Sequence, residues 1–237
     1  MKITVETHSH TLASGHAYST LKEMIMAAKE KGLEAIAITE HTPDMPGTCS
    51  IYYFQNYKVI PREQYGIKVM MGAELNIMDE AGKVDLKDDL LAELDLVVAS
   101  VHTPCYKGGL DKDAVTESYL NTMKNPHIDI IGHPDDGRFP IDYETLVKGA
   151  KDTETLLEVN NSSLSPVTVR QGCRENIIEM LTLCKRYQAP IVLGSDAHIE
   201  FDVGNTCYSL PVLEACEFPE ELVANTSLEK LKSFIRD

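Results

Sequence analysis

The sequence predicts a single α/β domain in which parallel strands form a barrel or near-barrel. Two observations support this. Seven short apolar, β-branched runs alternate with helical patterns, and no linker, low-complexity tract or repeat of fixed period divides them. The length of 237 residues also suits one large domain, because barrels of this size commonly remain undivided. We therefore expect one domain over residues 1–237.

The seven predicted strands have the composition of buried strands. Several of them, such as "LVVAS" and "IVLGS", are apolar at consecutive positions rather than at alternate ones. Strands that are covered on both faces of a parallel sheet show this pattern. In chain order the strands are predicted at residues 3–7, 35–41, 68–77, 96–102, 128–134, 156–161 and 190–196.

The clearest predicted helix lies in residues 19–32, "STLKEMIMAAKEKG". Thr20 and Glu23 have the spacing of a capping box, and Gly32 stands where a C-terminal cap belongs. The apolar stripe comprises Leu21, Met24, Ile25 and Ala28. Further helices are predicted at residues 113–124, 143–151, 174–188 and 227–237. Residues 43–64 form the longest stretch without clear periodicity, and we interpret them as an excursion over one mouth of the barrel.

The chain is strongly acidic, with 37 acidic and 22 basic residues and a formal net charge of −15. Such a surface repels phosphate backbones, which argues against binding of long nucleic acids. No apolar run reaches the roughly 18 residues of a membrane-spanning helix, and the N-terminus lacks a signal-peptide pattern. The six cysteines form no CxxC pair and are expected to be reduced. These features predict a cytoplasmic protein that does not associate with membranes.

Histidines and acids gather where the predicted strands end. Seven of the eight histidines lie at or just beyond the C-terminal end of a strand, and only His127 does not. In α/β barrels these ends converge on one face, which carries the active site. We therefore expect one pocket that collects His8, His10, His41, Glu74, His102, His133, Asp196 and His198.

Imidazole and carboxylate groups in this arrangement predict a metal centre. They suit Zn²⁺, Mn²⁺ or Fe²⁺, and the absence of clustered cysteines excludes a structural zinc knuckle. Residues i and i+2 of an extended strand point the same way, so His8 and His10 can hold one ion together. Asp196 and His198 repeat this spacing. A lone histidine at a strand end is more often a hydrogen-bonding loop residue, so it is the complete ordered set that favours metal binding.

The segments that carry these residues resemble the motifs of the PHP (polymerase and histidinol phosphatase) family. They are, in order, "THSHT", "ITEH", "GAE", "SVH", "GHPD" and "GSDAH", and they extend along the whole chain. "HAYSTL", "NNSS" and "GCREN" are most similar to the small bacterial YcdX-type phosphatases. The resemblance implies a distorted (β/α)7 TIM-like barrel with three divalent metal ions, commonly zinc, in its C-terminal mouth. It also implies a small phosphorylated substrate and allows a small homo-oligomer.

The resemblance further implies how the ligands divide among the three ions. Glu74 would bridge two of them. The first ion would be held by His8, His10, Glu74 and Asp196, the second by Glu74, His102 and His133, and the third by His16, His41 and His198. His16 enters only through the resemblance, because barrel geometry alone leaves it as a loop residue.

Two positions depart from the family pattern. Glu6 stands where relatives usually have Asp before the HxH segment, and Glu40 replaces the Asp of a usual "TDH". Neither is a ligand in this assignment. We expect both to orient imidazoles from behind, and the longer side chain to alter metal preference rather than abolish binding.

The expected chemistry is hydrolysis of phosphate monoesters, which is the activity of a phosphoric ester hydrolase. A metal-bridged water would lose a proton near neutral pH, because metal binding lowers its pKa from about 15.7 to roughly 7. Glu74 and Asp196 would position this hydroxide, and no serine or cysteine lies in a GxSxG context. The candidate arginines for the phosphoryl group are Arg170, Arg62 and Arg138.

Other functions stay open on the residues alone. An amidohydrolase-type barrel also opens with HxH and ends with Asp, but it holds one or two ions and has no evident use for His16, His41 and His198 together. Histidinol phosphatase and nuclease activities remain open within the PHP family. A non-catalytic role, in metal storage or as an accessory domain of a polymerase, is disfavoured by a complete ligand set in one cleft.

Overall fold

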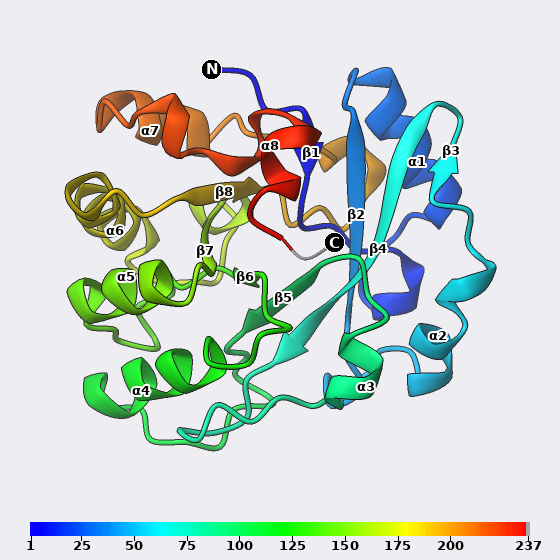
Figure 1. Cartoon of the computed structure of the whole chain (residues 1–237). Helices are drawn as coiled ribbons and strands as arrows, with labels where there is room; N and C mark the ends of the chain where they lie inside the picture. Colours follow the sequence, from blue (N-terminus) through cyan, green and yellow to red (C-terminus); the bar gives the residue numbers. More distant parts are fainter. Residues whose placement is uncertain (236–237) are drawn as a thin grey trace.

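The computed structural model describes residues 1–235 and shows the predicted alternation of strands and helices (Figure 1). Seven parallel strands are hydrogen-bonded in chain order, and a short β3 adds to β4 as an antiparallel hairpin. The strands are β1 Val5–Glu6, β2 Ala35–His41, β3 Glu63–Gln64, β4 Ile67–Asn76, β5 Val97–Ser100, β6 Ile130–Ile131, β7 Leu156–Asn160 and β8 Ile191–Gly194. The predicted single α/β domain with a seven-stranded parallel sheet is confirmed.

The first and last strands meet and bring the sheet close to a complete barrel. Beyond the strand ends, Ser9 and Ala197 form a parallel bridge. At the opposite end, the side chain of Asn225 lies between the two strands. Its Nδ2 donates to Val5 O (2.9 Å) and Leu193 O (2.7 Å), and its Oδ1 accepts from Leu193 N (3.1 Å). Asn225 therefore links β1 and β8 where their own backbones do not pair.

The helices surround the strands in chain order. Figure 1 shows α4, α5, α6 and α7 following one another along one side, with α1, α2 and β3 on the other. The capping box of Thr20 and Glu23 is present at α1, and Gly32 has a left-handed φ of 69° after that helix. The helices are α1 Leu21–Glu30, α2 Ile51–Gln55, α3 Asp88–Leu91, α4 Lys112–Thr122, α5 Tyr143–Asp152, α6 Cys173–Tyr187, α7 Ser209–Ala215 and α8 Leu228–Lys232.

Three helices were not expected, and one is shorter than expected. Helices α2, α3 and α7 are each seven residues long or shorter. Such short segments contain too few residues for a helical period of apolar positions to be recognised. The last helix, predicted at residues 227–237, ends at Lys232, with Ser233 as its C-terminal cap. Residues 236–237 of that prediction lie outside the described residues.

The segment 43–64 only begins at the mouth of the barrel. Thr48 Oγ1 donates to His41 O (2.6 Å), which keeps its first part at the C-terminal end of β2. The rest descends the outside of the barrel, because the rings of Phe54 and Tyr57 are buried there and Tyr57 Oη donates to Gly72 O (3.1 Å). The expected excursion over the mouth is therefore limited to the start of the segment.

The inward-facing side chains of each strand are apolar in the barrel core and become polar at the mouth. Inward apolar residues such as Ala35, Met70 and Leu96 form one buried cluster in the barrel, while outward residues pack against the helices. Because side chains alternate between the two faces of a strand, every second residue continues the same inward file. These files are Ala35, Ala37, Thr39 and His41 on β2; Met70, Gly72, Glu74 and Asn76 on β4; and Val192, Gly194 and Asp196 at β8.

Two further expectations concern the chain as a whole. No helix in residues 1–235 combines the length and the apolar character that crossing a membrane requires. No two cysteines in this part of the chain are joined by a disulfide.

Candidate metal centre

Four predicted ligands face one another at the centre of the mouth. His8 Nε2 lies 3.4 Å from Glu74 Oε1 and 3.7 Å from Asp196 Oδ1. His10 Nε2 lies 3.5 Å from Glu74 Oε2 and 3.4 Å from Asp196 Oδ1. Ligand atoms of a tetrahedral zinc ion, each about 2.0–2.1 Å from the metal, lie about 3.3–3.4 Å apart. The four side chains are thus spaced as ligands around a common centre.

Two more histidines reach the glutamate oxygen that His8 faces. His133 Nε2 lies 2.8 Å and His102 Nε2 3.1 Å from Glu74 Oε1. His133 has a positive φ of 29°, and its main-chain N–H donates to Glu158 Oε2 (2.7 Å). Glu74 is therefore approached by His8 and His10 and also by His102 and His133.

The remaining three histidines lie beside this cluster. His16 Nε2 and His198 Nε2 are 3.0 Å apart, and the rings of His16 and His41 stack with centroids 4.9 Å apart. His41 also faces inward, with Nδ1 2.8 Å from Glu74 Oε2, and it forms one compact group with His10 and His198. The structure thus brings all nine predicted ligands together.

Several ligand atoms are buried without a hydrogen-bond partner. They are His8 Nε2, His10 Nε2, His41 Nδ1 and Glu74 Oε2. Buried polar atoms are normally paired, because an unpaired one forfeits its bonds to water. These four atoms lie in one cluster, where His41 Nδ1 and Glu74 Oε2 are 2.8 Å apart, and their side chains are standard metal ligands, so they fit divalent cations.

Hydrogen bonds behind the rings direct the ligand nitrogens toward this centre. His8 Nδ1 lies 2.7 Å from Glu158 Oε1, and His10 Nδ1 lies 3.0 Å from Ser14 Oγ. Ser14 Oγ donates to Glu40 Oε2 (2.6 Å). A partner at Nδ1 leaves Nε2 free for a metal, which fixes both the tautomer and the orientation of the ring.

The two departures from the family pattern have different roles. Glu40 orients His10 through Ser14, as expected. Glu6 holds backbone rather than an imidazole: it accepts from the N–H groups of His8 (2.9 Å), Ser195 (3.1 Å) and Gly204 (2.8 Å). Glu6 therefore joins the chain segments at the ends of β1 and β8, next to ligands on both.

The charges at the centre favour ionised carboxylates. Burial opposes ionisation of Glu74, but the nearby rings of His102, His41 and His8 outweigh it and hold the pKa of Glu74 well below its usual range. Burial also opposes ionisation of Asp196, and His8, His10 and Arg170 together hold its pKa well below normal. Both carboxylates are therefore in the form that binds cations.

The three candidate arginines lie in different places. Arg170 is at the centre: Nη2 donates to Asp196 Oδ2 (3.0 Å) and Nη1 to Ser163 Oγ (2.9 Å). Arg138 follows β6 at the same end of the barrel and pairs with Asp136 (2.5 Å).

Arg62 does not reach the site. It precedes β4 and pairs with Asp95 (2.5 Å), which precedes β5, so it lies at the N-terminal ends of the strands. The expectation that Arg62 binds the phosphoryl group is therefore wrong. The segment that carries it descends the barrel wall instead of covering the mouth.

The comparison with known families settles the affiliation of the chain. A model of the PHP domain matches residues 6–164, which include seven of the nine predicted ligands. The chain belongs to the PHP domain family. A probable phosphatase of Caldicellulosiruptor saccharolyticus is 47% identical over 100% of this chain and 97% of its own length. One of Clostridium novyi is 43% identical over 100% and 96%. This PHP protein is therefore a phosphatase, a phosphoric ester hydrolase.

A solved structure supports the fold of this PHP protein. The histidinol phosphate phosphatase of Lactococcus lactis, determined in complex with zinc, L-histidinol and phosphate, has a TM-score of 0.63 and 18% identity. The match covers 92% of this chain and 95% of that one. At this identity the likeness establishes the shared barrel architecture.

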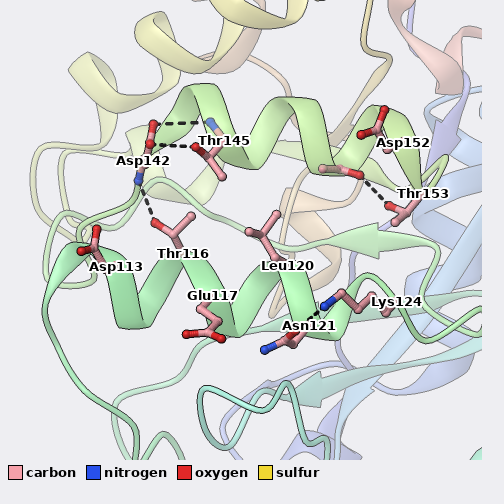
Figure 2. A pocket seen from close by; sticks show the side chains of 11 residues that line it. Asp113, Thr116, Glu117, Leu120, Asn121, Lys124, Asp142, Thr145, Asp152 and Thr153 are labelled. Atoms are coloured by element: carbon pink, nitrogen blue, oxygen red, sulfur yellow. Dashed lines mark hydrogen bonds between the residues drawn. The ribbon is translucent and has the colours of Figure 1, made fainter.

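A surface groove between α4 and α5 of the PHP protein, shown in Figure 2, has no part in this site. Its polar groups serve the helices themselves. Asp142 Oδ2 accepts from Thr145 Oγ1 (2.8 Å), and Thr116 Oγ1 accepts from Asp142 N (2.9 Å). The residues lining it include acids but no histidine.

Apart from Glu40, the residues that support the predicted ligands could not be identified from the sequence. Glu158 and Asn76 lie within strands β7 and β4, where a polar residue among buried apolar ones was the available signal. Ser14 lies in a short 3-10 helix after the HxH segment. No local pattern distinguishes a serine that orients a ligand from one that caps a turn.

Proposed function

We propose that this site hydrolyses phosphate monoesters with three divalent metal ions, zinc in the first place, and Mn²⁺ or Fe²⁺ as the other ions that suit these ligands. The observation that carries the proposal is the set of buried, unpaired ligand atoms that converge around Glu74. The ligands of the three ions are His8, His10, Glu74 and Asp196; Glu74, His102 and His133; and His16, His41 and His198.

The ions would supply Lewis-acid charge for the phosphoryl oxygens and lower the pKa of a bound water to roughly 7. The chain's own residues would orient the reaction. Glu74 bridges two ligand groups, and Asp196 Oδ1 faces both His8 and His10, so these carboxylates position the attacking water and can take up its proton.

Arg170 is the residue best placed to hold the phosphoryl group. Its guanidinium is anchored on Asp196, Ser163 and Asn160, and these contacts use only some of its five N–H donors. The others can bind a phosphoryl oxygen in a fixed direction, and its charge stabilises negative charge in the transition state. Arg138, more exposed and paired with Asp136, is a secondary candidate at the same mouth.

The substrate we propose is a small phosphate monoester. The Lactococcus lactis enzyme was solved with L-histidinol and phosphate, which supports an ester with a small alcohol. The net charge of −15 disfavours long nucleic acids.

Elemental analysis of the purified protein, combined with a phosphate-ester panel, tests the proposal. We expect about three ions per chain and turnover of p-nitrophenyl phosphate. His10→Ala and Glu74→Gln should lower both. His127→Ala, which changes the one histidine outside the cluster, should lower neither. Wild-type metal content and rate in His10→Ala would contradict the proposal, and one or two ions with turnover of an amide or lactone would favour an amidohydrolase.

A further inference from the structure

The amide of Asn76 lies between a predicted ligand and an acid that has no place in the ligand set. Asn76 stands two residues after Glu74 on β4, so both side chains point into the mouth. Asn76 Oδ1 lies 2.7 Å from His102 Nδ1, and its Nδ2 donates to Asp85 Oδ2 (2.8 Å). Asn76 is fully buried, so no water competes for these bonds.

Asp85 determines which way the amide of Asn76 faces. It accepts from the side-chain Nδ2 and also from the main-chain N–H of Asn76 (2.9 Å). A carboxylate offers only acceptors, so the Nδ2 group of Asn76 must face Asp85 and its oxygen must face His102. His102 must then carry a proton on Nδ1, so that Nε2, which lies 3.1 Å from Glu74 Oε1, is the nitrogen that can be deprotonated to bind a cation.

The same carboxylate also anchors the chain that follows another ligand, His41. Thr42 Oγ1 donates to Asp85 Oδ1 (2.6 Å), and Asp44 N donates to Asp85 Oδ2 (3.1 Å). Asp85 therefore ties the segment after β2 to the end of β4. In the sequence Asp85 lies in the loop that follows β4, nine residues after Asn76, and not at a strand end, where the ligands were predicted.

We propose that Asp85 is a positioning residue for the metal centre: through Asn76 it selects the Nδ1–H tautomer of His102, the form whose Nε2 can bind a cation. This inference rests on the proposed metal centre. The Nδ1–H of His8 faces the carboxylate of Glu158 directly. The Nδ1–H of His102 instead faces the neutral amide of Asn76, and Asp85 orients that amide.

The tautomer of His102 can be observed without metal or substrate. In ¹⁵N-labelled protein treated with a chelator at pH 8, long-range ¹H–¹⁵N spectra should show a proton on Nδ1 of His102; the loss of its signals in His102→Gln assigns them. In Asp85→Asn the new NH₂ group cannot accept a hydrogen bond, so only one atom at position 85 can still accept from the two N–H groups of Asn76. The Asn76 amide then keeps only its weaker contacts with Thr42 O (3.4 Å) and Thr42 Oγ1 (3.1 Å) and can turn more easily. We expect a mixture with the Nε2–H form. Competition with a chelator should show about tenfold weaker binding of one Zn²⁺ ion.

Exchanging the amide and the carboxylate between positions 76 and 85 distinguishes positioning of His102 from a general structural role of Asp85. In the double variant Asn76→Asp/Asp85→Asn, the carboxylate introduced at position 76 accepts both from the amide introduced at position 85 and from His102 Nδ1–H. The Nδ1–H form and the Zn²⁺ affinity should therefore recover. Asp79→Asn removes the same charge from the same loop, where Asp79 caps only Ala81 and Lys83, and should change neither. Thermal unfolding of each variant reports whether it folds.

The outcomes separate this inference from the proposed function. A wild-type His102 spectrum in folded Asp85→Asn, or a double variant that does not recover the Nδ1–H form, overturns the role of Asp85 while wild-type phosphatase activity and metal content still stand. A wild-type protein that binds Zn²⁺ but hydrolyses no phosphate ester overturns the proposed function, and the tautomer and Zn²⁺ measurements still support Asp85.

Discussion

Glu158 Oε1 lies 2.7 Å from His8 Nδ1, and both side chains are fully buried in the barrel. The two residues are 150 positions apart in the chain and meet because β1 and β7 flank β8 in the nearly closed sheet. The carboxylate holds the His8 ring with Nε2 toward the metal centre. Burial alone would disfavour the charged ring, but Glu158, Glu74 and Asp196 outweigh it and raise the pKa of His8 well above its usual range.

Replacing Glu158 by Gln should weaken metal binding about 10–100-fold. Glu158 Oε2 accepts from His133 N (2.7 Å) and Asn160 Nδ2 (3.0 Å), so an amide cannot serve these donors and His8 at once. Equilibrium dialysis with Zn²⁺ measures the loss. Glu154→Gln, an exposed acid just before the same strand, is the matched control and should bind as the wild type does. Equal affinities in the two variants would show that His8 needs no such partner.

Gly194 should tolerate no side chain. A Cβ there would overlap Glu158 Oε1 and lie 2.9 Å from His8 Cβ. Gly194→Ala must therefore displace the glutamate, and we expect about 1–3 kcal/mol lower stability together with reduced metal content. Urea unfolding and elemental analysis measure the two effects. Retention of both properties would mean that β8 can move away without cost.

Asp135 should make stability depend on pH. Neither of its carboxylate oxygens has a hydrogen-bond partner, and burial, partly offset by Arg170, raises its pKa from about 3.8 to about 7. Because the folded state then favours the protonated acid, stability falls as pH rises from about 4 to about 7.

Asp135→Asn removes this penalty, which the pKa difference puts at up to about 4 kcal/mol above pH 7. The stability of the variant relative to the wild type should therefore increase by about 3 kcal/mol between pH 5 and pH 8, as measured by urea unfolding. A difference independent of pH would show that Asp135 is ionised throughout this range.

Alanine substitutions of the three candidate arginines should lower kcat/KM by different factors. Arg170→Ala should lower kcat/KM for p-nitrophenyl phosphate about 100-fold or more, because a buried donor to the phosphoryl group is lost. Arg138→Ala should cost less than about tenfold, since this arginine is more exposed and paired with Asp136. Arg62→Ala should leave kcat/KM unchanged, because Arg62 pairs with Asp95 at the other end of the barrel. A loss in Arg62→Ala as large as in Arg170→Ala would refute this assignment.

Asn225→Ala should destabilise the barrel without affecting the metal centre. Three hydrogen bonds between the Asn225 side chain and the backbones of Val5 and Leu193 would be lost, with an expected cost of about 2–4 kcal/mol. Urea unfolding measures the change, and elemental analysis checks that metal content is retained. Loss of metal in folded Asn225→Ala would show that closure of the barrel at this end also shapes the mouth.

Local sequence patterns predicted the strands and most longer helices because their periods are set by the backbone. The capping box of Thr20 and Glu23 and the consecutive apolar runs are such local features. Short helices such as α2 were not predicted, because five residues are too few to show a helical period of apolar positions. The mouth could be located because parallel strands of a barrel end on one face.

The sequence by itself determined the α/β barrel and which histidines and acids gather at its mouth, from His8 at the first strand to His198 after the last. Only the tertiary structure decided which atoms face which: that Glu74 meets both His133 and His41, that Glu158 contacts His8 and Asp85 contacts Asn76, and that Arg170 rather than Arg62 lies at the mouth. Spacing along a strand follows from the backbone repeat, whereas a contact between distant strands depends on how the whole barrel packs.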